Sequence, residues 1–138
     1  ETGGHAFARL ADEYVEMDGT FSLDDKWSEE FKKGWRANID TSSDPEKVKW
    51  AKFITDQRYS SEDIGVYEGA ALYSKGIWRP SQNSLMGYDD QRTIFNAPSR
   101  EAIYKQAMTL SEGPGWEYDY ETFVAFDKPG EPKVYKIN

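Results

Sequence analysis

The stretch ETGGHAFARLADEY, residues 1–14, contains His5, the only histidine of the 138-residue chain, four positions after Glu1. Apolar residues recur in this stretch at the spacing of one helical face, which predicts a helix over residues 1–16. On that helix the side chains of Glu1 and His5 would project from the same face. A metal-ligating imidazole and a carboxylate that acts as a general base need this arrangement.

Asp12 and Glu13 are the first acidic residues after His5, and Asp12 is a candidate for a second metal ligand. On a continuous helix His5 and Asp12 would be about 10 Å apart along the axis, at about 1.5 Å per residue. Two ligands of one zinc ion each lie about 2 Å from it. Either the helix ends soon after His5 and the chain turns back, or Asp12 is not a ligand. The plainer interpretation makes His5 a surface histidine and places Asp12 and Glu13 in a solvated helix end.

The composition is that of a folded domain and limits the partners that the chain can bind. Aromatic residues make up 15% of the chain, which argues against disorder. Its 17 basic and 25 acidic residues give a net charge of −8, which disfavours nucleic-acid backbones and anionic membranes. Cysteine is absent, so disulfides and thiolate ligands are excluded. No apolar run approaches the roughly 20 residues of a membrane span, and no signal peptide is recognisable.

Helical and strand patterns both occur along the rest of the chain, so the predicted fold class is α+β and helix-dominated, with short strands. Trp27, Phe31 and Trp35 recur at helical spacing after a capping box that begins at Ser22. Pro98 opens the clearest later helix. The remaining expectations are a turn at 17–20, a helix at 44–57, strands at 64–73 and 77–79 with a turn at 74–76, an irregular segment at 81–88 and a short strand at 122–126.

The segment Ser84-Leu85-Met86-Gly87-Tyr88 places a methionine in an irregular turn, although methionine mostly fills cores on regular elements. Tyr88 could reach a metal-bound oxygen and hydrogen-bond the oxyanion of a tetrahedral intermediate. Core packing is the plainer explanation for Met86. By itself the segment does not separate these roles.

Taken together, the two segments resemble the IgA-peptidase-like metallopeptidases, which are secreted bacterial zinc enzymes of the metzincin type. The resemblance rests on residues 3–14 and 78–86, with further similarity at 65–70 and 95–100, and extends to about Met108. Metzincins combine an extended HExxH helix with a downstream methionine-containing turn, the Met-turn. The resemblance implies zinc as the cofactor and peptide-bond hydrolysis as the activity.

The resemblance also implies roles for individual residues. Glu1 matches the general base, His5 the second histidine ligand and Asp12 the third ligand. A first histidine ligand is then expected immediately before Glu1, so the chain would be the later part of a longer catalytic domain.

Four further residues receive roles from the resemblance. Met86 matches the apolar floor beneath the metal, and Tyr88 matches the tyrosine that approaches the zinc or the transition state. Glu68 and Arg79 are candidates for supporting the ligands or lining the substrate cleft, although Arg79 fits a structural salt bridge equally well.

Two local features depart from the family pattern. Glu1 and His5 are four positions apart where HExxH has three, and a π-bulge at the two glycines between them could absorb the extra residue. The turn after His5 would fall near Ala8 or Arg9, where a positive φ costs a non-glycine residue about 1 kcal/mol.

The resemblance places residues 1–126 in the C-terminal part of a metallopeptidase catalytic domain and residues 127–138 in an exit tail or linker. The central sheet would lie mostly upstream, and that upstream part of the same protein would cover apolar faces of this chain. Substrates would be extracellular proteins or peptides, and the protein would be secreted, periplasmic or on the bacterial cell surface. Two alternatives remain: a module that binds glycans or a protein through exposed aromatic rings, and an inactive protease-like domain.

Overall fold

The computed structural model describes residues 2–87 and 94–131, so the predicted site residues Glu1 and Tyr88 lie outside the described residues, as does most of the expected tail. The elements are, in order, α1 (Thr2–Ala8), β1 (Val15–Thr20), α2 (Asp25–Lys32), α3 (Ala51–Thr55), the 3-10 helix η1 (Gln57–Glu62), β2 (Tyr67–Ala70), β3 (Leu72–Arg79), α4 (Ala97–Glu112) and α5 (Tyr120–Asp127). The fold is α+β, as predicted from the sequence.

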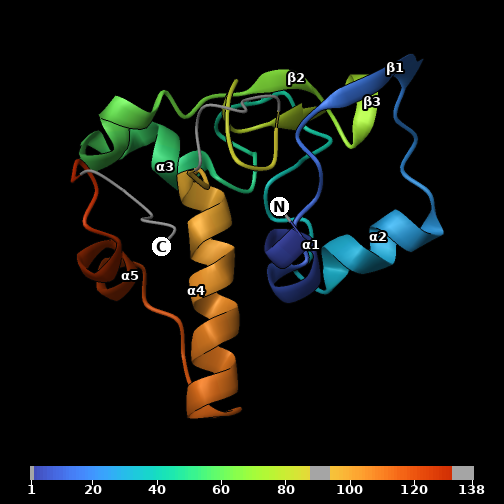
Figure 1. Cartoon of the computed structure of the whole chain (residues 1–138). Coiled ribbons are helices and arrows are strands. Elements are labelled where there is room, and N and C mark those ends of the chain that lie inside the picture. Colours follow the sequence, from blue (N-terminus) through green and yellow to red (C-terminus); the bar gives the residue numbers. More distant parts are fainter. Residues whose placement is uncertain (1, 88–93, 132–138) are drawn as a thin grey trace.

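The three strands form one mixed sheet in the order β1-β3-β2, in which β1 runs parallel and β2 antiparallel to β3. Figure 1 shows the sheet at one end of the molecule, with α1 and α2 below it and α4 running away from it beside α5. A parallel pair needs a long connection, and here α2, α3, η1 and β2 lie between β1 and β3 in the chain. Strand β1 lies at one edge of this sheet, and the segment that contains Asp12 connects α1 to it.

Two hydrophobic clusters divide the interior. The sheet cluster consists of Ala11, Phe21, Ile39, Ala70, Ala71 and Ile77, with Trp27, Phe31 and Tyr73 packed against it. The helical cluster consists of Val48, Trp50, Phe53, Tyr59, Ala97, Tyr104, Phe123 and Val124. Aromatic rings in both clusters meet edge to face, which is the arrangement that the ring quadrupole favours.

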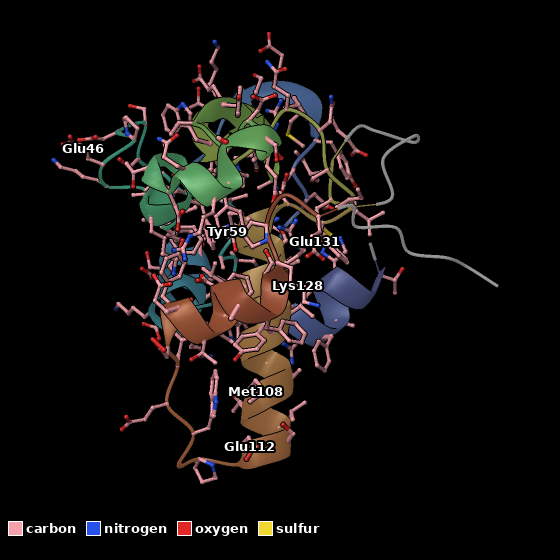
Figure 2. All side chains as sticks on the ribbon, turned by 90° about the vertical axis from the view of Figure 1, so that its left-hand side faces the viewer. Glu46, Tyr59, Met108, Glu112, Lys128 and Glu131 are labelled. Atoms are coloured by element: carbon pink, nitrogen blue, oxygen red, sulfur yellow. The ribbon has the colours of Figure 1, made fainter. Side chains whose placement is uncertain are left out.

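Helix α4 begins where Pro98 predicts. The Asn96 side chain caps it by accepting a hydrogen bond from the Ser99 amide at 3.2 Å, Pro98 lies in its first turn, and Gly113 follows its last residue. Figure 2 shows the lower end of α4, marked by Met108 and Glu112, extending past the other elements. The same view places Tyr59, Lys128 and Glu131 near its upper half, where α5 ends.

Several local predictions are wrong because contacts distant in sequence override the local pattern. Residues 15–20 pair with β3 and form a strand, where the sequence predicts a helix end and a turn. Residues 122–126 belong to helix α5, capped by Asp119 through the Thr122 amide, and not to a strand. Helix α2 forms, but its N-cap is Asp24 and Trp35 lies beyond its end.

The helix predicted from Asp44 is also shorter than expected. The Asp44 carbonyl accepts hydrogen bonds from the amides of Lys47 and Val48, which closes a turn, and α3 begins only at Ala51. No helix among residues 2–87 and 94–131 is both long and apolar enough to cross a membrane, as expected from the sequence.

Strands β2 and β3 are joined by a tight turn at Ala71 and Leu72, because Ala70 pairs with Tyr73. Both turn residues have positive φ, 48° and 76°, as the central residues of a type I′ turn do. The turn predicted at 74–76 lies inside β3 instead. Gly76 has a φ of 79°, and a Cβ there would lie 3.2 Å from Thr20, so this glycine permits a close strand contact.

Candidate functional site

The chain reverses direction immediately after the helix that carries His5. Helix α1 ends one residue before Arg9, which has a left-handed conformation with a φ of 56°. The Leu10 amide then donates a hydrogen bond to the Gly4 carbonyl at 3.1 Å. The prediction of one helix over residues 1–16 is therefore wrong, and the turn brings Asp12 back to His5. The positive φ occurs at Arg9, one of the two positions where the sequence analysis expected the turn.

The imidazole of His5 lies between a backbone carbonyl and the Asp12 carboxylate. Its Nδ1 is 2.9 Å from the carbonyl oxygen of Leu10, which can only accept, so Nδ1 carries a proton. Its Nε2 is 2.8 Å from Asp12 Oδ1. That oxygen is buried and accepts no well-directed hydrogen bond within the part of the chain that the structure describes. With a proton on Nδ1, the approach of Nε2 to the buried carboxylate oxygen requires either a second ring proton, which makes an ion pair with Asp12, or a metal cation between the two atoms.

Both groups are of the kinds that bind zinc. An imidazole nitrogen and a carboxylate oxygen bind zinc at about 2.0–2.2 Å, so two tetrahedral ligands would lie about 3.3 Å apart, wider than the 2.8 Å found here, which is the length of an ordinary ion pair. A zinc-ligating imidazole usually donates its other N–H to a carbonyl or carboxylate, as His5 does to Leu10. Catalytic zinc takes three protein ligands, and residues 2–87 and 94–131 contain no group of three candidate ligands. A complete zinc site therefore needs a ligand from outside these residues.

Met86 is fully buried beneath the helix that presents His5. A Cβ on Gly4 would lie 2.8 Å from the Met86 sulfur and 3.2 Å from the Phe95 ring, so only glycine permits this close approach. The described residues of α1 form an α-helix, without the π-bulge suggested for its two glycines. The irregular segment around Met86 forms as predicted over residues 81–87, and the Met86 carbonyl accepts the Glu13 amide at 2.7 Å.

Glu13 is a buried carboxylate, whereas the plainer interpretation of the sequence places it in a solvated helix end. It is 1% exposed, and its oxygens accept hydrogen bonds from Asn38 at 3.0 Å, Ser84 at 2.7 Å and Asn96 at 3.0 Å. Burial raises the pKa of the Glu13 carboxyl, and these hydrogen bonds oppose the rise. The donors lie 25, 71 and 83 positions away in the chain, so no local pattern could have identified them.

The backbone on either side of Asp12 is fixed by further hydrogen bonds. The Asn38 side chain accepts from the Ala11 amide and donates to the Ala11 carbonyl, both at 2.8 Å. The Ala71 amide donates to the Asp12 carbonyl at 2.8 Å. These hydrogen bonds fix the backbone from which the Asp12 side chain projects, which is how preorganised sites are built.

Glu68 and Arg79 occupy the β2–β3 hairpin. The Arg79 guanidinium donates to the backbone carbonyls of Glu68, Gly69 and Ser81 at 2.7–3.0 Å, and its charge also acts to lower the Glu13 pKa. The Glu68 carboxylate is 3.5 Å from Lys75 Nζ. Neither residue lines the cavity beside His5 and Asp12.

That cavity has a volume of about 380 Å³. Besides the His5–Asp12 pair, it is lined by Ala11, Trp27, Arg36, Ala71 and Leu72. It opens between the end of α1, helix α2 and the β2–β3 turn, so a ligand in it would lie directly beside the two candidate metal ligands.

No model of a known protein family matches the chain, and no curated protein matches it significantly. The family resemblance therefore rests on the motifs quoted above, and the candidate site rests on its own geometry.

Proposed function

We propose that the chain is the later part of a metzincin-like, IgA-peptidase-like zinc peptidase and supplies His5 and Asp12 as metal ligands. The observation that supports this most is the 2.8 Å approach of His5 Nε2 to Asp12 Oδ1, with Nδ1 bonded to a carbonyl. The turn at Arg9 carries a steric cost for a non-glycine residue, and it is the feature that brings the pair together.

Zinc at this position would polarise a peptide carbonyl and lower the pKa of its bound water. Within the proposal, Glu1 takes a proton from the attacking water as general base, and Tyr88 donates a hydrogen bond to the developing oxyanion. His5 and Asp12 hold the metal in place. Met86 provides an apolar floor under α1, which limits access of water from below.

The proposed architecture extends beyond the described residues. Residues 1–126 would form the C-terminal part of the catalytic domain, and residues 127–138 an exit tail or linker. The upstream part of the same protein would supply the first histidine ligand, directly before Glu1, and most of the central sheet. The protein would cleave extracellular proteins or peptides, after secretion or at the bacterial cell surface.

A binding module with exposed aromatic rings is the main alternative. Trp50 is buried, and the other four tryptophans are half-buried. No tryptophan or tyrosine among residues 2–87 and 94–131 is exposed, which gives little support to an aromatic platform. An inactive protease-like domain would keep the same geometry, so only an activity measurement separates it from a peptidase.

The His5 geometry can be tested by NMR, because one histidine gives a single pair of imidazole ¹⁵N signals. We expect a ring protonated on Nδ1, and added zinc should shift the Nε2 signal. Asp12→Ala should remove the zinc-dependent shift, whereas Glu16→Gln, an exposed carboxylate on β1, should leave it. An imidazolium paired with Asp12 that zinc does not displace would argue against a metal site.

The activity is tested in the protein that includes the residues before Glu1. We expect about one zinc per molecule by elemental analysis and cleavage of an unfolded protein substrate. His5→Ala and Asp12→Ala should lose both zinc and cleavage, while Glu1→Gln should keep zinc and lose cleavage. Zinc binding without cleavage in the unmodified protein would identify an inactive domain, and unchanged cleavage by Glu1→Gln would exclude Glu1 as the base.

A further inference from the structure

Helix α4 carries apolar side chains on two faces. Its inner face packs in the helical cluster through Tyr104. On its outer side Ile103, Ala107 and Leu110 recur at i, i+4 and i+7, which is the spacing of a second apolar stripe. Leu110 is 67% exposed and Phe126 on α5 is 69% exposed, more than any other large apolar side chain in the part of the chain that the structure describes. Exposed apolar surface of this kind marks a candidate interaction site.

An apolar groove of about 860 Å³ lies between α4 and α5 and includes part of this stripe. Its walls and floor are mostly aliphatic or aromatic and come from Ile103, Tyr104, Ala107, Met108, Phe123 and Phe126. The Phe126 ring lies 5.2 Å from the Tyr104 ring, between their centroids. On α4 the lining residues extend from Arg100 to Met108, which is about 12 Å along the axis at about 1.5 Å per residue. The groove is therefore about as long as two turns of a helix.

The arginine at the polar end of the groove is already paired. Arg100 and Asp127 lie there, and Arg100 Nε donates to Asp127 Oδ1 at 2.8 Å. The other guanidinium nitrogens donate to the Asp127 and Glu62 carboxylates and to the Phe95 carbonyl. An anionic group of a ligand would have to displace one of these carboxylates. Binding in the groove therefore depends on apolar contact.

Acidic residues predominate on the elements that form the groove. Along residues 97–131 the basic residues are Arg100, Lys105 and Lys128, whereas the acidic residues are Glu101, Glu112, Glu117, Asp119, Glu121, Asp127 and Glu131. Arg100 and Lys105 are paired with carboxylates of this region. Glu112 and Glu131 are exposed and form no ion pair within residues 2–87 and 94–131. Figure 2 places Glu112 at the lower end of α4 and Glu131 near its upper half, so carboxylates lie near both ends of the groove.

This distribution of charge and shape selects among the possible ligands. Carboxylates near both ends repel fatty acids, anionic lipid headgroups and nucleic acids. A second copy of the chain would bring the same carboxylates and another hollow surface against the first. A segment that is basic, convex and apolar on one face is complementary in both respects.

We propose that the groove between α4 and α5 binds an amphipathic helix of a partner protein, with lysine or arginine beside its apolar face. Apolar side chains at i and i+7 of such a helix are about 10 Å apart along its axis, which matches the length of the groove. They contact Met108 and Phe126, and the basic side chains pair with Glu112 and Glu131. The inference does not depend on the proposed peptidase function, since this groove and the cavity beside the His5–Asp12 pair share no lining residue.

Binding is tested with a synthetic peptide of about 14 residues, four helical turns, that has leucines on one face and lysines on the other. Isothermal titration calorimetry with the full protein, including the residues before Glu1, should give a micromolar Kd that weakens as the salt concentration rises. The same peptide with glutamate in place of lysine should not bind. Equal binding of both peptides would overturn the proposal. So would no binding of either, which is the result expected if the upstream part of the same protein covers the groove.

Substitutions in the groove then locate the peptide. Ala107→Arg places a long charged side chain in the groove, and Ala125→Arg is the matched control, because Ala125 is exposed on α5 but does not line the groove. We expect Ala107→Arg to bind the lysine peptide at least about tenfold more weakly, with a much smaller change in Ala125→Arg. Phe126→Ala should also weaken binding about tenfold, and circular dichroism checks that the fold persists. Unchanged binding in both Ala107→Arg and Phe126→Ala would overturn the site.

The carboxylates near the ends of the groove are tested in pairs. Glu112→Gln combined with Glu131→Gln should weaken binding about fivefold at low salt and flatten its salt dependence. Glu16→Gln combined with Glu46→Gln is the control, because both residues are exposed on other parts of the molecule. Equal losses in the two double variants would indicate a general attraction to the net charge and overturn a site at this groove. Self-association in sedimentation experiments that Ala107→Arg abolishes would identify a second copy as the occupant and overturn the basic partner.

Discussion

The regions around the sheet cluster and the helical cluster use polar groups in different ways. In the helical region, Arg100 is 7% exposed and pairs with Asp127 at 2.8 Å and with Glu62 at 2.6 Å. These ion pairs connect α4 to α5 and η1. In the site region, the buried carboxylate of Glu13 is hydrogen-bonded by the neutral side chains of Asn38, Ser84 and Asn96. One region uses charge to join helices, and the other uses neutral donors to position the segment beside Asp12.

The two regions also differ in where residues with positive φ occur. Positive φ values in the helical region occur at Asp63 and Lys128, which follow helix ends. Those beside the cavity include Ala71 and Leu72 in a turn that glycine would suit better. The comparison indicates that the helical region is built for stability, whereas the site region accepts local strain to place particular groups.

The largest expected effect is that of Arg100→Met in the helical region. The substitution leaves the Asp127 and Glu62 carboxylates without their buried partner, and we expect a loss of about 3–5 kcal/mol in unfolding free energy. Urea unfolding measures it. Lys32→Met is the control, since Lys32 pairs with Glu29 at the surface and should matter much less. Equal losses in the two variants would contradict the contrast between buried and surface pairs.

Glu13→Gln tests the site region. The side-chain amide of the new glutamine would place an N–H donor against Asn96 or Ser84, which themselves donate hydrogen bonds to Glu13. We therefore expect the unfolding free energy to fall by about 1–3 kcal/mol. Under the proposed zinc binding by His5 and Asp12, Glu13→Gln should lower the zinc affinity about 10- to 100-fold, because the Asp12 segment is less well held. Glu16→Gln should change neither quantity. A stability loss with unchanged zinc affinity would leave Glu13 a purely structural role.

Gly4→Ala and Gly3→Ala form a matched pair on helix α1. A Cβ on Gly4 would meet the Met86 sulfur at 2.8 Å, whereas a Cβ on Gly3 has no neighbour within 4 Å. We expect Gly4→Ala to lower the unfolding free energy by about 1–3 kcal/mol and Gly3→Ala to raise it by about 0.5–1 kcal/mol. Thermal unfolding monitored by circular dichroism gives both values. A similar gain in both variants would mean that Met86 is not packed against α1.

The two regions should respond to pH with opposite signs. The Arg58 hydrogen bonds hold the pKa of Asp56 well below its usual value near 3.8, so its contribution to stability is present above that pH and lost as the pH falls. Burial raises the pKa of Glu13 above its usual value near 4.5, so its contribution is present below that pH and lost as the pH rises through the folded-state pKa.

Urea unfolding between pH 3 and pH 8 measures both contributions. Asp56→Asn should weaken the decline in stability towards acid, and Glu13→Gln should weaken a decline above pH 4.5. Parallel pH profiles for the unmodified protein and Glu13→Gln would show that the Glu13 carboxyl does not titrate differently in the folded and unfolded states.

The smallest expected effect is that of Ala71→Gly. Relief of the left-handed conformation stabilises the fold by about 1 kcal/mol, and the greater freedom of glycine in the unfolded chain offsets most of this gain. The melting temperature should therefore change by only a few degrees. Ala70 is fully buried in β2, so Ala70→Gly should be destabilising. A large loss in Ala71→Gly would show that the turn is not strained.

A feature of the fold was predictable when the residues that determine it lie close together in the sequence. The start of helix α4 was predicted because Pro98, the residue that indicates it, lies in the first turn of the helix. Strand β1 was missed, since its partner residues in β3 lie more than 50 positions away. The sequence singled out His5, Asp12 and Met86, which the structure brings into one region, but it did not show that Glu13 is buried beside them. The local sequence of a short apolar or acidic segment does not show which distant residues it will contact in the folded protein.

The sequence by itself determined the α+β class, the course of α4 and the candidate chemistry of His5, because composition, caps and motif spacing are local properties. Tertiary structure alone decided that the chain turns at Arg9, that Asp12 meets His5 and that Glu13 is buried. The physical reason is that a left-handed turn at a non-glycine residue and a buried carboxylate are both unfavourable in isolation. They become stable only when hydrogen bonds from distant segments surround them.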